Sequence, residues 1–211
     1  MVELRTDIKR EVNMDNYKII TIAREYCAGG TSIAKGLSER LGIPWYDRDF
    51  ARITAEHSGY TYEEVMDEGE EISGFSSALN SFLNSAAPYT SSFDAIFNAQ
   101  KEELIALSEK PCIVIGRCGN AICQKAGIKS FDIFLYADME KRIERCKELT
   151  ENTQFDIKAM EKKDSMRENY YKKYTGHELG DYREYNICLD TGTIGYDKCV
   201  DILADILKDK I

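Results

Sequence analysis

Long apolar segments are what this sequence most clearly lacks. No run among the 211 residues approaches the roughly 20 apolar residues that a membrane-spanning helix needs. Residues 1–16 also lack the apolar core of a signal peptide, and their charges alternate in sign. We therefore expect no membrane partner. Residues 1–16 should form a polar N-terminal tail, either frayed or docked on a partner.

An excess of positive charge is also missing. The formal net charge is −9 and the sequence pI is about 4.9, which argues against general binding to nucleic acid or to an anionic membrane surface. Any phosphate site must therefore concentrate its cations locally. With 43% apolar and 31% charged residues, the composition is that of an ordinary globular protein. The length allows one core, or one core with a small inserted subdomain.

The cysteines lack the spacing of a metal site or a disulfide framework. There are seven, an odd number, scattered along the chain, and several lie inside apolar strand or helix patterns. Cys118 and Cys123 do not match a zinc-finger spacing, and no histidine accompanies them. We expect reduced thiols that serve as small hydrophobic side chains, and hence a cytoplasmic protein without structural disulfides.

Short, continuously apolar runs are present instead. Such runs are typical of parallel strands that are covered on both faces. They occupy residues 17–23, 111–116, 131–137 and 185–190, with a shorter fifth run at 42–47. Amphipathic helical patterns separate them at residues 30–41, 138–149, 153–174 and 195–210. This alternation predicts an α/β fold of three layers, with a central parallel five-stranded sheet and right-handed crossovers.

Two regions interrupt the alternation. Residues 48–110 show no obvious strand and are polar, with helical patterns at both ends. An insertion of this size over the carboxyl edge of a parallel sheet usually covers a ligand. Within it, residues 70–100 are compatible with an ordered subdomain, a contact in a homodimer, or a loop that orders on binding. Residues 153–180 are rich in charges, arginine and tyrosine, which favours a lid over a plain solvent-exposed helix.

The segment after the first predicted strand resembles a phosphate-binding loop without its lysine. Against the P-loop pattern G-x-x-x-x-G-K-[ST], Arg24 replaces the first glycine and Gly30 replaces the lysine, while Gly29 and Thr31 keep their positions. A glycine turn that leads into a helix directs backbone N–H groups and the helix dipole at one point, which favours an anion. The alternative is a plain strand-to-helix turn. The expected phosphate-binding residues are Cys27, Ala28, Gly29, Gly30, Thr31 and Ser32, with Thr31 also placed to ligate Mg²⁺.

Five stretches in register resemble the cytidylate kinase-like family of P-loop nucleotide kinases. They are "TIAREYCAGGTSIAKGLSERLGIPWYD", "IVIGRCGN", "FLYADMEKRIERC", "KDSMRENYYKKYTG" and "YNICLDTGTIG", and the resemblance covers most of residues 17–208. It implies a P-loop NTPase fold with a helical acceptor-binding insertion at about 48–110 and a lid at about 153–180. It also implies ATP and Mg²⁺ as cofactors, and transfer of the γ-phosphoryl group to a small-molecule nucleotide, a nucleoside monophosphate.

The resemblance assigns three residues to the acceptor. Asp47 matches an aspartate at the edge of the nucleoside-monophosphate site, although it could instead cap the segment that follows. Arg117 matches an arginine that contacts the acceptor nucleotide, and its guanidinium offers a bidentate fork to a phosphate or a base edge. Asp190 fits a contact to the acceptor at the sheet edge, with a helix-capping turn as the alternative.

In the lid, Asp164 and Arg167 match the family's D-x-x-R pattern. Their i, i+3 spacing places both on one helix face, so an ion pair within the helix is the competing interpretation. If the lid closes, it delivers Arg167 to the transferring phosphoryl group and expels water. Arg142 and Arg145, after the fourth strand, are expected on a solvated or adenine-side face.

Several positions depart from the family pattern. Gly30 replaces the P-loop lysine, Cys118 stands where cytidylate kinases carry an aspartate, and Met160 stands at a lid arginine position. These departures favour the main alternative, a non-catalytic nucleotide- or phosphate-binding regulatory protein. The second strand lacks the relatives' D-T-G, which leaves a kinase for a non-nucleotide metabolite as a further alternative. We hypothesise that Arg24 is catalytic, with Asp164 and Arg167, and supplies part of the missing lysine's charge; otherwise it pairs with Glu25 or another acid and faces solvent.

Overall fold

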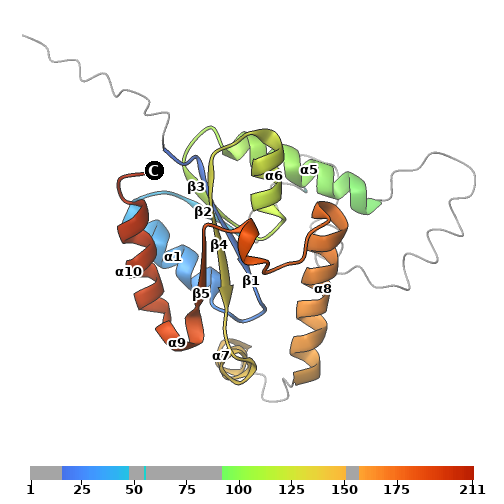
Figure 1. The fold of residues 1–211 in the computed structure, drawn as a ribbon, viewed down its shortest axis with the longest axis vertical. Coiled ribbons are helices and arrows are strands. Elements are labelled where there is room, and N and C mark those ends of the chain that lie inside the picture. Colours follow the sequence, from blue (N-terminus) through green and yellow to red (C-terminus); the bar gives the residue numbers. More distant parts are fainter. Residues whose placement is uncertain (1–15, 48–54, 56–91, 151–156) are drawn as a thin grey trace, which may run out of the picture.

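A parallel five-stranded sheet forms the centre of the molecule (Figure 1). The computed structural model describes residues 16–47, 55, 92–150 and 157–211. The strands are β1 (Ile19–Arg24), β2 (Trp45–Tyr46), β3 (Cys112–Ile115), β4 (Ser130–Tyr136) and β5 (Ile187–Asp190). Their order in the sheet is β2-β3-β1-β4-β5, and every pairing is parallel. The predicted sheet is confirmed, including the short strand within residues 42–47.

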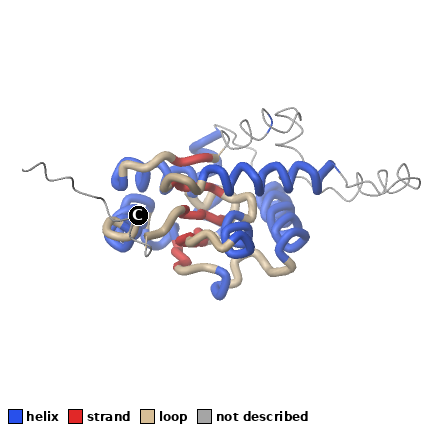
Figure 2. The backbone as a smooth tube through the Cα atoms, turned by 90° about the horizontal axis from the view of Figure 1, so that it is seen from above, coloured by secondary structure: helices blue, strands red, loops and turns tan. Residues whose placement is uncertain are grey.

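Helices cover both faces of this sheet and complete the three layers. They are α1 (Gly30–Leu41), α5 (Ser92–Leu107), α6 (Gly119–Ala126), α7 (Met139–Thr150), α8 (Ile157–Thr175), α9 (Thr191–Ile194) and α10 (Tyr196–Leu207), with a 3₁₀ turn at η1 (Tyr182–Glu184). The helices α1 and α10 pack together on one face, whereas α5, α6 and α8 lie on the other side (Figure 2). The doubly wound α/β fold is therefore confirmed.

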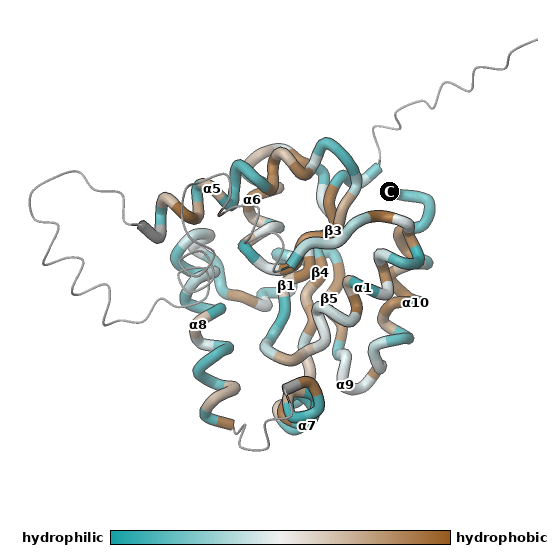
Figure 3. The backbone as a smooth tube through the Cα atoms, turned by 180° about the vertical axis from the view of Figure 1, so that it is seen from behind, coloured by the Kyte–Doolittle hydropathy of each residue, from teal (hydrophilic) through white to brown (hydrophobic). Residues whose placement is uncertain are grey.

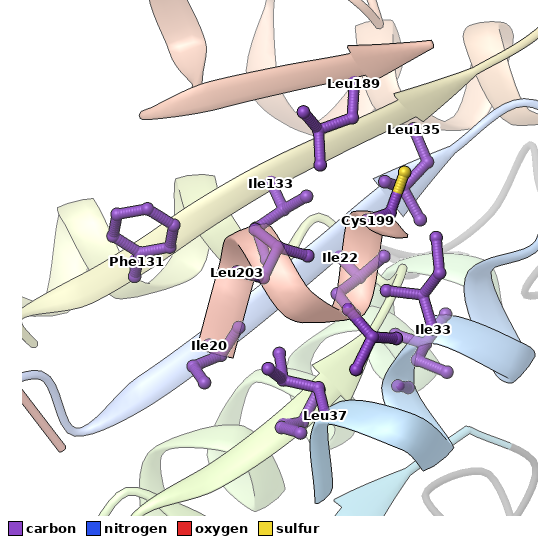
Figure 4. Packing of buried hydrophobic residues seen from close by; sticks show 14 of the residues in the cluster. Ile20, Ile22, Ile33, Leu37, Phe131, Ile133, Leu135, Leu189, Cys199 and Leu203 are labelled. Atoms are coloured by element: carbon purple, nitrogen blue, oxygen red, sulfur yellow. The ribbon is translucent and has the colours of Figure 1, made fainter. Parts of the chain in front are cut away.

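The core explains why the strands are apolar without alternation. In β1, the central strand, Ile20 and Ile22 point into the cluster formed with α1 and α10, and they are completely buried (Figure 4). Ile19 is equally buried on the opposite face, against Leu104 and Val114. Brown, hydrophobic stretches accordingly run through the strands, and teal, hydrophilic ones alternate with them along the helices (Figure 3). The close-packed core makes the sheet a rigid platform for whatever its edge carries.

The two regions that interrupted the alternation are partly described. The helix α5 confirms a helical pattern at the C-terminal end of the 48–110 region, whereas residues 48–54 and 56–91 lie outside the described residues, as does most of the tail.

The predicted lid contains the helix α8, which begins at Ile157. Its Tyr170 and Tyr171 are buried against Cys118, so α8 is packed on the domain and is not a plain solvent-exposed helix. Within the described ranges, no helix combines the length and apolar character needed to cross a membrane.

Candidate active site

An open cavity lies at the carboxyl edge of the sheet, where parallel strands of α/β proteins usually bind their ligands. Its volume is about 550 Å³. The loop of residues 24–32 lines it, together with side chains from the ends of β2 and β3 and from α8. Of the residues predicted for the site, Arg24, Asp47, Arg117 and Arg167 come together here.

The loop backbone has the geometry of an anion site. The first intrahelical bond of α1 runs from the Ile33 N–H to the Gly29 carbonyl, at 2.9 Å, so the N–H groups of residues 30–32 precede the helical ladder. Gly29 has a φ of 87°, and a Cβ there would lie 2.1 Å from Tyr196 Cε1. Only glycine therefore fits at this position, and the helix begins with its free N–H groups and positive dipole end at the cavity.

Arg24 lies over the glycine that replaces the lysine. A Cβ at Gly30 would come within 3.2 Å of Arg24 Cγ, and one at Gly116 would lie 2.4 Å from Arg24 Nη1. The side chain is only 16% exposed, and Nη2 lies 3.8 Å from Asp47 Oδ1. Arg24 therefore does pair with an acid, as the alternative interpretation held, but it does not face solvent. Its guanidinium lies between the phosphate loop and the ends of β2 and β3.

Asp47 connects the second strand to the start of α1. The Thr31 hydroxyl donates a hydrogen bond to Asp47 Oδ2 at 3.0 Å. A hydroxyl and a carboxylate are the oxygen ligands that Mg²⁺ accepts, usually one or two from the protein with phosphate and water completing the shell. The described residues contain no cluster of three or more His, Cys, Asp or Glu side chains that could hold a metal alone. The Thr31–Asp47 pair therefore fits a Mg²⁺ that is shared with bound phosphates.

A strained turn presents Arg117. Gly116, Arg117 and Cys118 all have positive φ, at 75°, 58° and 54°. Left-handed conformations of non-glycine residues cost about 1–3 kcal/mol each and concentrate at functional sites. Below this turn, a smaller recess of about 50 Å³ opens towards α6 and α8. Arg24, Arg117 and Arg167 border both the recess and the larger cavity, so three cations gather in a chain of net charge −9.

The thiols of this region are not nucleophiles. Burial raises the pKa of Cys118 to about 12, and burial together with the neighbouring Cys146 thiol raises the pKa of Cys27 to about 12. Both therefore stay protonated at neutral pH, whereas a reacting cysteine would need to be a thiolate. All seven cysteines are free thiols, as expected from the sequence.

Asp164 is turned towards the loop. Its Oδ1 accepts a hydrogen bond from the Tyr26 N–H at 2.7 Å, and its Oδ2 accepts one from Arg142 Nη1 at 2.5 Å. Arg167 lies with Cζ 5.0 Å from the centre of the Tyr26 ring, and its Nη1 is 3.5 Å from the Arg24 carbonyl oxygen. Asp164 thus pairs with an arginine of another helix.

Arg142 is the residue that the sequence analysis misplaced. It is buried, with its side chain 6% exposed, so the expected solvated face is wrong for it. Its i, i+4 spacing from the fully buried Cys146 was the available signal, because residues four apart share a helix face. Arg145 does reach the phosphate loop, where its Nη2 donates to Ser32 Oγ at 3.2 Å.

Asp190 does not join the other predicted acceptor residues. It ends β5, which is the edge strand opposite β2, whereas Asp47 follows β2 itself. The Thr193 hydroxyl donates a hydrogen bond to Asp190 Oδ2, and the N–H groups of Thr193 and Gly192 donate to Oδ1. These hydrogen bonds, with that of the Thr193 hydroxyl as the largest cause, lower the pKa of the Asp190 carboxyl. The helix-capping alternative is therefore the one the structure supports, because Asp190 caps α9.

Solved structures of low sequence identity share this fold. A protein from Eubacterium ventriosum ATCC 27560, described as uncharacterized, has a TM-score of 0.63 and 22% identity, covering 92% of this chain and 99% of its own. Shikimate kinase from Bacteroides thetaiotaomicron has a TM-score of 0.53 and 14% identity, covering 90% and 98%. Shikimate kinase from Acinetobacter baumannii, in complex with shikimate, has a TM-score of 0.51 and 16% identity, covering 93% and 97%. These similarities establish a P-loop kinase-like fold.

Sequence comparison identifies the family. No curated protein sequence matches this chain significantly. A family profile, however, matches residues 19–193, from the first strand through the short helix after β5. That range includes the phosphate loop, the strained turn at Arg117 and the Asp164–Arg167 pair of α8. The chain belongs to the cytidylate kinase-like family.

Proposed function

We propose that this protein transfers the γ-phosphoryl group of ATP to a small acceptor in a Mg²⁺-dependent reaction, with a nucleoside monophosphate as the first candidate. The loop backbone of residues 27–32 supplies donors for the phosphates of ATP. Arg117 orients the acceptor, and Arg167 approaches the transferring group from α8. If the acceptor is itself a phosphate anion, no general base is needed. Phosphoryl transfer then depends on positioning and on neutralising charge.

The position of Arg24 carries this proposal. In a complete P-loop the lysine neutralises the β- and γ-phosphates. Here the aliphatic part of Arg24 packs on Gly30, where the lysine would begin, and its guanidinium stays at the cavity. A glycine at position 30 leaves the room that Arg24 uses. We infer that the positive charge of the site has moved from position 30 to position 24.

The Thr31 hydroxyl and the Asp47 carboxylate would hold the metal ion. A Mg²⁺ held there would supply positive charge that offsets the charge of the phosphates during transfer. Asp47 also keeps Arg24 in place through their ion pair. We therefore assign Asp47 to both the metal and the acceptor side of the cavity.

Moving the cationic side chain from position 24 to position 30 tests the role of Arg24. Arg24→Ala should lower kcat/KM by roughly 10² to 10³, the cost of losing one preorganised charge donor. The double variant Arg24→Gly with Gly30→Lys restores a P-loop lysine and should regain at least tenfold of that loss. Arg40→Gln, which breaks a surface ion pair between α1 and Asp201 of α10, is the control. Unchanged ATP affinity and turnover in Arg24→Ala would contradict the proposal.

Acceptor assays separate the alternatives. ADP release should be measured with CMP, UMP, AMP, GMP and small phosphorylatable metabolites, including shikimate. The fold accommodates a non-nucleotide acceptor, since one similar structure is a shikimate kinase in complex with shikimate. Saturable ATP binding without acceptor-dependent ADP release would instead support a regulatory nucleotide-binding protein, which the loss of the lysine favours. We further propose that the protein works in the cytoplasm, because its cysteines are free thiols. We also propose that it acts on small molecules and not on nucleic acid, because its net charge is −9.

A further inference from the structure

Tyr26, in the middle of the phosphate loop, is held at both ends of its backbone by two helices. Its N–H donates to Asp164 Oδ1 of α8 at 2.7 Å, and its carbonyl accepts from Arg142 Nη1 of α7 at 3.3 Å. The same Arg142 nitrogen donates to Asp164 Oδ2 at 2.5 Å. The loop, α7 and α8 are therefore joined in one closed ring of hydrogen bonds.

Arg142 is buried and makes further polar contacts inside the protein. Besides the ring, its Nε donates to the Ala137 carbonyl at 3.0 Å and lies 3.2 Å from Glu25 Oε2. Glu25 in turn accepts from the Ala137 N–H at 3.2 Å, and burial raises the pKa of this carboxyl. A buried arginine that faces two carboxylates and two carbonyls is costly to disturb, because removing one partner leaves a charge buried without compensation. We therefore expect this ring of hydrogen bonds to stay closed in the folded protein.

The aromatic side chain of Tyr26 also contacts Arg167, so Arg167 is connected to the loop as well. The Arg167 guanidinium carbon lies 5.0 Å from the Tyr26 ring centre, within the range of a cation–π contact. Arg167 follows Asp164 by one helical turn of α8, so both side chains lie on the face that meets the loop. The N–H, the carbonyl and the ring of Tyr26 are each in contact with one of these charged side chains.

We propose that Arg142 and Asp164 are positioning residues that fasten α8 to the phosphate loop through Tyr26. The loop is then formed before ATP arrives, and Arg167 keeps a fixed position relative to it. The inference rests on the proposed function for the identity of the bound phosphate compound. It changes the role expected for Asp164, because both carboxylate oxygens hold the protein itself. It also makes the Asp164–Arg167 segment of α8 move with the loop and not as an independent lid.

Direct binding and amide exchange test this proposal without relying on turnover. Arg142→Gln and Asp164→Asn should each weaken Mg²⁺–ATP binding, measured by calorimetry, on the order of tenfold to a hundredfold, as for loss of a charge-assisted hydrogen bond. The double variant should lose no more ATP affinity than the more strongly affected of the two single variants, because both substitutions break the same connection. Hydrogen exchange of the Tyr26 amide should become faster in both. Arg142→Lys keeps the charge and should recover part of the affinity.

Arg40→Gln, on the surface of α1, is the control and should match the wild type in affinity and exchange. Asp164→Asn keeps the volume of the side chain but has one acceptor oxygen in place of two, so it cannot accept from both the Tyr26 N–H and Arg142 in the observed geometry. It therefore tests the ring even if Arg142→Gln does not fold. Unchanged ATP affinity and Tyr26 exchange in Asp164→Asn, or multiplying losses in the double variant, would overturn the proposal. A wild-type protein that binds ATP without acceptor-dependent turnover would overturn the proposed activity alone.

Discussion

Gly116 is the residue on which the position of the Arg24 guanidinium most directly depends. A Cβ at this position would lie 2.4 Å from Arg24 Nη1, and the backbone φ is 75°. Gly116→Ala should therefore displace Arg24 as well as strain the turn. We expect the variant to lose about 1–2 kcal/mol of unfolding free energy from the left-handed backbone and at least tenfold in ATP affinity. Urea denaturation and calorimetry measure the two effects.

Gly42 offers the matched control for this substitution. Its φ is 69°, similar to that of Gly116, but nothing lies within 4 Å of a Cβ built there. Gly42→Ala should therefore lose comparable stability while ATP affinity stays at the wild-type value. Equal losses of affinity in the two variants would mean that backbone strain, and not displacement of Arg24, causes the effect.

At the scale of elements, Asp190 in the turn from β5 into α9 distinguishes a helix cap from the predicted acceptor contact. Because this side chain caps α9, Asp190→Ala should lower the melting temperature by a few degrees. The KM for any acceptor should stay unchanged, since β5 and β2 are opposite edges of the sheet. Asp190→Asn keeps a capping oxygen and should retain most of the stability. A specific rise in the acceptor KM would support the predicted acceptor contact instead.

The pairing of β1 with β4 contains a half-buried carboxyl whose ionised form is disfavoured. Asp132 stands opposite Thr21 in the ladder and accepts its hydroxyl hydrogen bond at 2.6 Å. Burial raises the pKa of Asp132 above its ordinary value of 3.8, so the ionised form is disfavoured in the folded state. The contribution of this group to the unfolding free energy therefore falls as pH rises from 3.8 through the raised pKa.

Asp132→Asn removes that charge and keeps an acceptor for Thr21. The variant should be more stable than the wild type at pH 7, and the difference should shrink as the pH approaches 4, when Asp132 takes up its proton. Urea midpoints between pH 4 and pH 8 measure the difference, with Asp205→Asn, at an exposed side chain, as the control. A difference that does not change with pH would contradict this assignment.

At the scale of the whole molecule, nucleotide binding should appear as global stability. The phosphate loop joins β1 to α1, and both elements contribute to the main core cluster. A ligand that binds only the folded state, at a free concentration of 100 times its Kd, stabilises that state by about 2.7 kcal/mol. For a chain of this size the melting temperature should rise on the order of 5–10 °C with Mg²⁺–ATP. Differential scanning calorimetry measures the shift.

The same experiment after chelation isolates the metal. EDTA should reduce the shift, because Thr31 and Asp47 then contribute nothing to phosphate binding through Mg²⁺. Thr31→Ala should require a higher Mg²⁺ concentration for half of the full shift. A melting temperature that does not respond to ATP at any concentration would contradict ATP binding, and with it the ATP-dependent kinase and an ATP-binding regulatory protein.

Much of this protein could be predicted from local sequence. Continuous apolar runs identified the parallel strands, because a strand covered on both faces needs apolar side chains at every position. The turn after β1 predicted a glycine loop that leads into a helix, since the glycines and the helix start are neighbours in the chain. Arg117 could be placed at the cavity because the carboxyl ends of parallel strands share one edge. Its strained backbone was not visible in the sequence.

What only the tertiary structure decided depends on contacts between residues far apart in the chain. The order of the strands puts Asp190 at the edge opposite Asp47, although the sequence shows each at the end of a strand. The packing of α7 and α8 buries Arg142 and brings Asp164 to the Tyr26 N–H, across 138 residues. The sequence itself determined the sheet, the helices and the glycine loop between β1 and α1 because their signals are local. Packing decided the partners of Arg24 and Arg142, because the fold brings Asp47 and Asp164 to them from distant parts of the chain.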